Sequence, residues 1–237
     1  MIQLTIDDKL IEIQADRTIL EACREHGIYI PTLCYHPALK PYGGCRLCMV
    51  ELILDSSDTQ LVAACAYPCK QGLVVRSDSD AVKKSRRLTL ELLLASAFQT
   101  PEMIMLAQQL GVQEIRYKMP QADSCILCGL CVRACQEIVG VSAISLTHRG
   151  ISKQVNAPYK IASSSCIGCG TCVLICPTGH IQLSNVISFQ SDHIFSSEHE
   201  QALCKLCADA RVGLKSDNLL TSIPENMLII SEEVSNG

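Results

Sequence analysis

The sequence predicts an α+β fold made of two small domains that are joined by a helical linker. Three observations indicate this fold: apolar and polar residues alternate at the N-terminus, a helical pattern without cysteines follows, and one cysteine run then occurs twice. We place the first domain at residues 1–78, the linker at 79–120, the second domain at 121–190 and a polar tail at 191–237.

The first domain is predicted to begin with a β-hairpin that is followed directly by a helix. Apolar residues alternate with polar ones over residues 1–14, on both sides of a turn at Asp7 and Asp8. Thr18 and Glu21 have the spacing of a capping box, and Gly27 stands where a helix would end. Further strands are expected at 49–54 and 73–75. This order of hairpin, helix, loop and strands is that of a β-grasp domain.

The cysteines of the first domain have the spacing of a [2Fe-2S] ligand set. Their intervals of ten, two and sixteen residues place two or three thiolates in one loop and the last at the end of a distant strand. Gly43 and Gly44 lie in this loop, where a missing side chain lets backbone amides approach a cluster closely. The expected ligands are Cys34, Cys45, Cys48 and Cys65.

The linker is predicted to contain two helices whose apolar faces pack the two domains together. The helical signals are Leu88, Leu92 and Leu93, then the run from Met103 to Leu110, with Gly111 as terminator.

The second domain carries the run Cys-x2-Cys-x2-Cys-x3-Cys twice, which is the ligand pattern of a two-cluster bacterial ferredoxin. In this pattern the fourth cysteine of each run binds the other cluster. One [4Fe-4S] cluster is therefore expected on Cys125, Cys128, Cys131 and Cys176, and a second on Cys135, Cys166, Cys169 and Cys172. Strands are expected at 143–146 and 180–183, after each run.

Four cysteines fall outside these three sets. Cys204 and Cys207 form a Cys-x2-Cys pair in the tail, which is either half of an additional metal site or two reduced thiols. Cys23 is expected to be buried as a small apolar residue, and Cys69 is the last of these four cysteines. His36 lies close to Cys34, but we expect a polar or partner-facing role because the four-cysteine set is already complete.

Composition excludes several classes of function. A formal net charge of −4, without a large basic block, predicts no binding to nucleic acid. We recognise no export signal and no apolar stretch long enough to span a membrane, so we expect a cytoplasmic protein whose thiols stay reduced. Aromatic residues make up only 4% of the chain, and bound clusters would supply stability that so small a core lacks.

The segments IPTLCYHP, YGGCRLCMVEL, ACAYP and CILCGLCVRACQEIVGVSAISLTHRG resemble the N-terminal region of the largest iron-sulfur subunit of respiratory complex I. They also resemble the small diaphorase subunit of bidirectional NAD-linked hydrogenases, and the corresponding parts of iron-only hydrogenases and NAD-linked formate dehydrogenases. Such proteins often carry a further His-x3-Cys-x2-Cys-x5-Cys motif between the two domains. The matching stretch ASAFQTPEMIMLAQQLGVQEIRYKM has neither His nor Cys, so that cluster is expected to be absent.

The resemblance implies an electron-transfer subunit in a hetero-oligomer, placed between an NADH-binding flavoprotein subunit and a catalytic redox subunit. That partner enzyme would be a hydrogenase, a formate dehydrogenase or another low-potential reductase, and an electron-bifurcating assembly is among these options. No dinucleotide fingerprint, phosphate loop or nucleophile arrangement indicates a catalytic site in this chain itself. The alternatives are a freely diffusing ferredoxin-like carrier and, less favoured by the cysteine spacing, a zinc-binding structural module.

Overall fold

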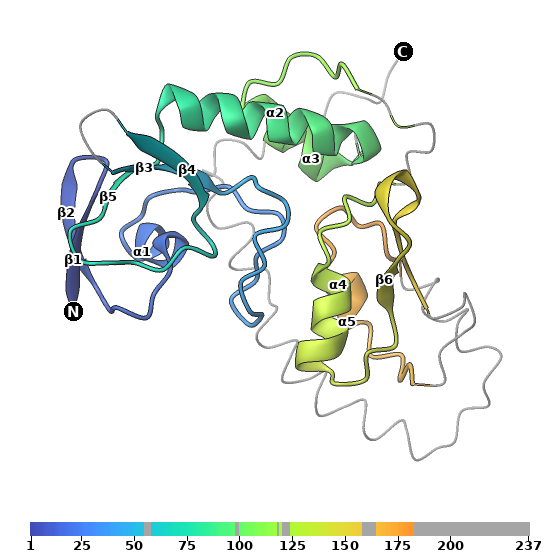
Figure 1. Ribbon diagram of the computed structural model, residues 1–237. Helices are drawn as coiled ribbons and strands as arrows, with labels where there is room; N and C mark the ends of the chain where they lie inside the picture. The colour runs from blue at the N-terminus through green and yellow to red at the C-terminus, as the bar shows by residue number, and fades with distance from the viewer. Residues whose placement is uncertain (55–57, 98–99, 118, 120–123, 158–164, 183–237) are drawn as a thin grey trace, which may run out of the picture.

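A computed structural model describes residues 1–182 except 55–57, 98–99, 118, 120–123 and 158–164. Cys204, Cys207 and the tail lie outside these residues. Figure 1 shows the N-terminal sheet on one side, the long helix α2 (Asp80–Ala97) above it, and the short helices of the second domain on the other side. The α+β architecture predicted from the sequence is confirmed.

The N-terminal sheet is mixed and has the strand order β2-β1-β5-β3-β4. Its strands are β1 (Ile2–Ile6), β2 (Lys9–Ile13), β3 (Met49–Ile53), β4 (Thr59–Ala63) and β5 (Val74–Arg76). The first and last strands in chain order, β1 and β5, pair in parallel at the centre, which is the arrangement of the β-grasp fold. The sequence prediction missed β4, an edge strand whose first three residues are exposed and therefore do not alternate.

The hairpin turn between β1 and β2 is hydrogen-bonded to the residue that follows β5. Asp7 and Asp8 both have positive φ angles, of 48° and 65°, as a two-residue hairpin turn requires. The carboxylate of Asp7 accepts hydrogen bonds from the Ser77 amide at 2.7 Å and the Ser77 hydroxyl at 2.5 Å. The turn therefore fixes the position at which the chain leaves β5 for the linker.

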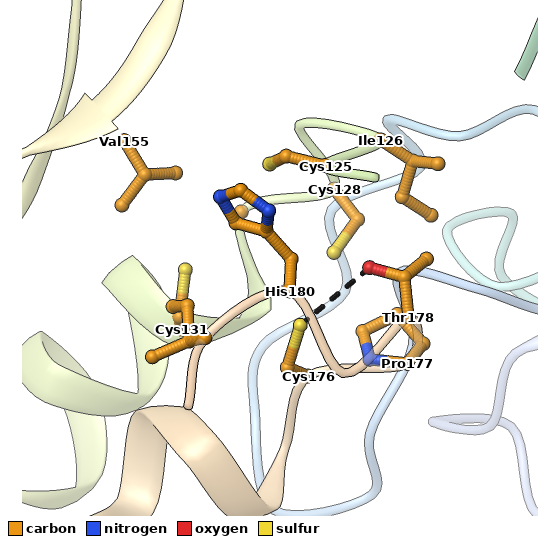
Figure 2. A pocket seen from close by; sticks show the side chains of 11 residues that line it. Cys125, Ile126, Cys128, Cys131, Val155, Cys176, Pro177, Thr178 and His180 are labelled. Carbon is orange, nitrogen blue, oxygen red and sulfur yellow. Dashed lines mark hydrogen bonds between the residues drawn. The ribbon is translucent and has the colours of Figure 1, made fainter. Parts of the chain in front are cut away.

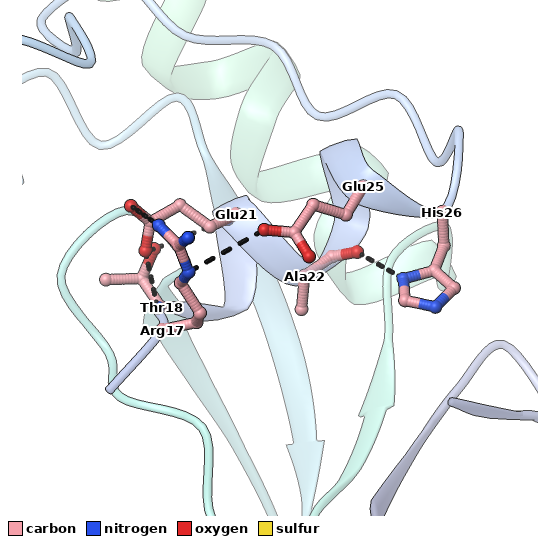
Figure 3. A network of polar contacts seen from close by, with 6 residues as sticks. All are labelled: Arg17, Thr18, Glu21, Ala22, Glu25 and His26. Carbon is pink, nitrogen blue, oxygen red and sulfur yellow. Dashed lines mark hydrogen bonds and ion pairs between the residues drawn. The ribbon is translucent and has the colours of Figure 1, made fainter. Parts of the chain in front are cut away.

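Helix α1 (Ile19–Glu25) has the predicted capping box, which Figure 3 shows. The Glu21 amide donates to the Thr18 hydroxyl at 3.3 Å, and the Thr18 amide donates to the Glu21 carboxylate at 2.7 Å. At the other end Nδ1 of His26 lies 3.0 Å from the carbonyl oxygen of Ala22. Side chains of the cap residues Thr18 and His26 thus contact backbone groups at both ends of this short helix.

The two predicted linker helices are present as α2 and α3 (Pro101–Gln109). The buried face of α2 includes Leu90 and Leu94, whereas Leu88 and Leu92 are 45% and 53% exposed. The sequence-based assignment of Leu88 and Leu92 to the packing face was therefore wrong. The buried face of α2 differs from the predicted one because it includes Arg86, a polar residue. The Arg86 guanidinium donates two hydrogen bonds to the Met49 carbonyl, at 3.1 and 2.8 Å.

The second domain is built from short elements around the cysteine runs. Helix α4 (Leu130–Arg133) continues into a π-helical turn, η1 (Ala134–Ile138), and α5 (Thr171–Leu174) lies within the second run and contains Cys172. Strand β6 (Ser145–Thr147) pairs antiparallel with β7 (Gln154–Asn156) across the 3-10 turn η2 (Gly150–Ser152).

The strand predictions for this domain are only partly correct. The first strand occupies 145–147 rather than 143–146, because Ala143 directs its amide to the sulfur of Cys135 instead of to a neighbouring strand. The second predicted strand is absent over 180–182, where the chain lines a pocket instead, and residue 183 is outside the described part.

Two apolar clusters hold these elements together. The first fills the space between the N-terminal sheet and α1. The second joins the cysteine loop of the first domain to α2, α3 and the first cysteine run of the second domain, through residues such as Leu47, Leu90, Met103 and Leu130. The linker helices therefore pack the two domains together, as predicted. In the described part of the chain, no helix combines the length and hydropathy needed to cross a bilayer.

The capping box gives a test of the local structure. We expect Thr18→Ala to lower the free energy of unfolding by about 1 kcal/mol, because the Glu21 amide then loses its acceptor. Hydrogen exchange of the α1 amides and urea unfolding of the cluster-loaded chain measure this. Thr18→Ser keeps the hydroxyl and should behave as wild type, and an equal loss in both variants would contradict this assignment.

Candidate metal centres

The four N-terminal cysteines converge beside the end of the β-grasp sheet. Three lie on the loop between α1 and β3, the fourth follows β4, and none is more than 7% exposed: Cys34, Cys45, Cys48 and Cys65. The amide of Cys45 donates a hydrogen bond to the sulfur of Cys34 at 3.3 Å. The structure thus brings together all four cysteines of this predicted set.

These four thiols interact in two pairs. A hydrogen bond from the Cys45 thiol lowers the pKa of Cys34 to about 6 and raises the pKa of Cys45. A hydrogen bond from the Cys65 thiol similarly lowers the pKa of Cys48 to about 7, while the pKa of Cys65 rises. One sulfur of each pair is therefore readily ionised, which is the form that binds a metal.

The two glycines shape this loop through a positive φ angle and through the space that their missing side chains leave. Gly43 has a φ of +65°, in the left-handed region, and a Cβ there would lie 3.6 Å from the Cβ of Ala66. A Cβ on Gly44 would clash with the Tyr42 ring. The Gly44 amide donates to the Cys34 sulfur, and this hydrogen bond also lowers the pKa of Cys34, after the larger effect of the Cys45 thiol. The loop therefore presents backbone donors to sulfur.

The first cysteine run surrounds a pocket that a cysteine of the second run completes. Figure 2 shows the side chains of Cys125, Cys128, Cys131 and Cys176 around this space, which is partly open to solvent. The other lining residues include Ile126, Val155 and Pro177. The structure thus gathers the predicted set, including the member from the distant run.

Burial has the largest effect on the pKa values of Cys128 and Cys131 in this group. Loss of hydration raises the pKa of Cys128 to about 12, and the nearby thiols of Cys176 and Cys125 contribute to this rise. Cys131 is also raised to a pKa of about 12 by burial, with contributions from Cys128, Cys125 and Cys176. Thiols in such surroundings stay protonated at neutral pH, and iron that bound to their sulfurs would displace these protons into solvent.

Cys135, the last cysteine of the first run, lies near the first three cysteines of the second run. Burial raises the pKa of Cys172 to about 11, and the thiols of Cys169, Cys166 and Cys135 add to this shift. The Ala143 amide donates to the Cys135 sulfur at 3.2 Å. These four cysteines are only partly buried, so this group is nearer to solvent than the first.

Amides and hydroxyls supply further hydrogen bonds to the sulfurs of the second domain. The Leu127 amide lies 3.4 Å from the Cys125 sulfur. The buried hydroxyls of Thr171 and Thr178 lie 3.3 and 3.7 Å from the sulfurs of Cys169 and Cys176. Donors of this kind stabilise sulfur that carries negative charge, so the surroundings fit an iron–sulfur cluster.

Sequence reasoning missed four residues of these sites: Arg133, Thr171, Thr178 and His180. Figure 2 shows the His180 ring directed into the first pocket. Thr171 and Thr178 each stand two residues after a cysteine, and that spacing is the signal that could have indicated them. Arg133 lies between Cys131 and Cys135, but its hydrogen bonds are to the other domain, which sequence spacing does not reveal.

Cys23, Cys69 and His36 take no part in these groups. Burial raises the pKa of Cys23 to about 12 and that of Cys69 to about 11, and both pack in the first apolar cluster. His36 accepts a hydrogen bond from the Ala38 amide at 3.2 Å through Nδ1, which is a local role within its loop. Among the residues that the structure describes, no group of three or more His, Cys, Asp or Glu is placed to hold a single metal ion.

The β-grasp sheet, the repeated cysteine runs and the three gathered groups of thiols define an iron–sulfur protein with two ferredoxin-type domains. Comparison with known families agrees with this class. Residues 1–80 match the 2Fe-2S iron-sulfur cluster binding domain, and residues 124–180 match the 4Fe-4S dicluster domain.

Individual proteins identify the family more closely. The chain is 32% identical to an NADH-quinone oxidoreductase subunit of Rhizobium meliloti over 205 residues, which cover 76% of this chain and 24% of that protein. It is 32% identical to NADPH-Fe(3+) oxidoreductase subunit alpha of Geobacter sulfurreducens over 232 residues, covering 88% of this chain and 27% of that protein. The chain thus spans about a quarter of the length of these relatives.

A solved structure is also similar to this chain. A chain of the NAD+-reducing [NiFe]-hydrogenase in the H2-reduced state is 32% identical, with a TM-score of 0.58 over 66% of this chain and 74% of that one. The protein therefore belongs to the family of iron–sulfur electron-transfer subunits that includes this hydrogenase chain and the matching subunit of NADH-quinone oxidoreductase.

The two threonines give a test of the sites. We expect Thr171→Val to lower the reduction potential of one [4Fe-4S] cluster, because a donor to sulfur is lost. A three- to tenfold change in the reduction equilibrium corresponds to roughly 30–60 mV. Thr178→Val should have a smaller effect, on the other cluster, because its hydroxyl lies farther from sulfur.

Redox titration followed by EPR measures both potentials. The matched Thr→Ser variants keep the hydroxyl and should titrate as wild type does. If both valine variants shift the same cluster, the two hydroxyls do not serve separate groups.

Proposed function

We propose that this chain is an electron-transfer subunit that carries single electrons through one [2Fe-2S] and two [4Fe-4S] clusters. The observation that carries this proposal is the exchange of cysteines between the two runs: Cys176 lies with the first triplet and Cys135 with the second. Bound clusters of these types accept and release one electron at a time. The ligands are the twelve cysteines of the three groups described above.

The [2Fe-2S] site and the first [4Fe-4S] site are proposed to exchange electrons directly. Cys34 and Cys45 share one apolar cluster with Cys128 and Cys131. Cys34 is also close enough to Cys128 to raise its pKa, although burial is the larger cause. The second [4Fe-4S] site would then stand at the other end of the series, on the more exposed side. This order needs no fourth cluster between the domains.

The partners are proposed from the relatives' names. They describe an NADH-quinone oxidoreductase, an NADPH-Fe(3+) oxidoreductase and an NAD+-reducing hydrogenase. We therefore propose a hetero-oligomer in which a flavoprotein subunit oxidises or reduces a pyridine nucleotide and a catalytic redox subunit handles the remote substrate. That subunit would be a hydrogenase, a formate dehydrogenase or another low-potential reductase.

The domain limits at residues 78 and 120 stay predictions. A cytoplasmic location of the protein also stays a prediction.

Elemental analysis tests the cluster content. Protein purified without oxygen should contain about ten iron atoms and a similar amount of acid-labile sulfide per chain. Far fewer irons without sulfide would reject the proposal, and stoichiometric zinc would support a structural module instead.

Serine substitution tests the exchanged ligands. Cys135→Ser should damage the cluster of the second triplet and leave that of the first intact, and Cys176→Ser should do the reverse, because each sulfur lies with the other run's triplet. EPR spectra of the reduced proteins measure each cluster separately. The control is Cys69→Ser, since Cys69 lies outside the three groups. Loss of the cluster of the same run in each variant would contradict the exchange.

Native purification tests the partners. A tagged chain isolated without oxygen from its own cells should retain a flavin-containing companion, and reduced pyridine nucleotide should reduce its clusters within that complex. A stable and active native assembly without flavin would exclude the NADH-linked role. A chain recovered alone, and still exchanging electrons with several enzymes, would indicate a free carrier.

A further inference from the structure

Arg133 is a residue of the second domain whose hydrogen bonds lie in the first. It ends α4, and its side chain is only 12% exposed. One guanidinium nitrogen donates to the carbonyl of Cys34 at 3.1 Å, and another donates to the carbonyl of Lys40 at 2.6 Å. The two acceptors stand on the loop that also supplies Cys45 and Cys48 to the N-terminal group. A single side chain therefore spans both ends of the 34–40 segment.

Glu137 and Tyr42 complete this contact. Glu137, one turn after Arg133, accepts a hydrogen bond from the Lys40 amide at 2.9 Å and lies 3.6 Å from the Arg133 guanidinium. The guanidinium carbon also lies 5.1 Å from the centre of the Tyr42 ring, at a distance typical of a cation–π contact. Five separate interactions thus involve Arg133 or Glu137, and four of them join the two domains.

The charge of Arg133 lies beside the N-terminal group of cysteines. Its guanidinium donates to the carbonyl of Cys34, a member of that group, and its side chain is nearly buried. A positive charge in this position favours the additional negative charge of a reduced cluster, and burial strengthens this effect. Glu137 lies beside it and opposes it in part.

We propose that Arg133 is the positioning residue that couples the two domains: it fixes the [2Fe-2S] loop on the first [4Fe-4S] motif and favours the reduced state of the [2Fe-2S] centre. This inference rests on the proposed function, because it concerns the potential and placement of a cluster that the chain is proposed to hold. Arg133 itself is not one of the proposed ligands.

The test uses the full chain with its clusters, and the readout is the EPR-monitored midpoint potential of the [2Fe-2S] signal. Arg133→Gln should lower the potential, by a three- to tenfold change in the reduction equilibrium, or roughly 30–60 mV. Glu137→Gln keeps an acceptor for the Lys40 amide but loses the opposing charge, so it should raise the potential. Arg133→Lys keeps the charge and should restore most of the wild-type value.

A second readout reports the placement of the two centres. Spin–spin broadening between the reduced [2Fe-2S] and [4Fe-4S] centres depends on their separation. It should weaken in Arg133→Gln and in Arg133→Lys, because neither side chain can donate to both carbonyls in the same fork. The matched control is Arg149→Gln, which removes the same charge from an exposed position of the same domain.

The outcomes separate this inference from the proposed function. If Arg133→Gln and Arg149→Gln give equal [2Fe-2S] potentials, or if Glu137→Gln shifts the potential in the same direction as Arg133→Gln, the inference is overturned. Wild-type iron content and reduction by a flavoprotein companion would still support electron transfer in that case. A wild-type chain without clusters would overturn both.

Discussion

Repulsion among closely spaced sulfurs is the constraint on which the rest of this structure depends. Twelve thiols are gathered into three small groups, and most of those in the first two are buried, where negative charge is costly. The loops reduce that cost with backbone amides and hydroxyls directed at sulfur, as at Cys34, Cys135 and Cys169. At Ala143 this need also limits a strand, because an amide engaged with sulfur cannot pair with a neighbouring strand.

The two domains form one unit because they share an interior. The second apolar cluster contains residues of the N-terminal loop, both linker helices and the first cysteine run. Arg86 connects α2 to the sheet by donating hydrogen bonds to the Met49 carbonyl. Glu91 of the same helix forms an ion pair with Arg116, whose Nε lies 2.6 Å from the Glu91 carboxylate. The helices therefore hold the N-terminal thiols against the first run of the second domain, and the route of electrons proposed above depends on this packing.

The sequence predicted what local spacing determines and missed what tertiary contact determines. The hairpin, the capping box at Thr18 and the linker helices follow from short-range patterns, and the structure contains them. The grouping of cysteines from distant segments could be predicted only because the repeated run is a known ligand pattern. Strand β4 was missed because an edge strand need not alternate, and the packing face of α2 was misplaced because a buried arginine forms part of that face. Arg133 and His180 were overlooked since their positions depend on neighbours distant in sequence.

The position of Cys176 in the first pocket has a consequence for biosynthesis. Three of the four sulfurs there come from a single short run, but the fourth belongs to a segment that the ribosome makes much later. Until Cys176 has been made, this group lacks its fourth thiol. A cluster with four cysteine ligands could therefore be completed here only after translation has passed the second run, so each half of the domain would depend on the other for its maturation.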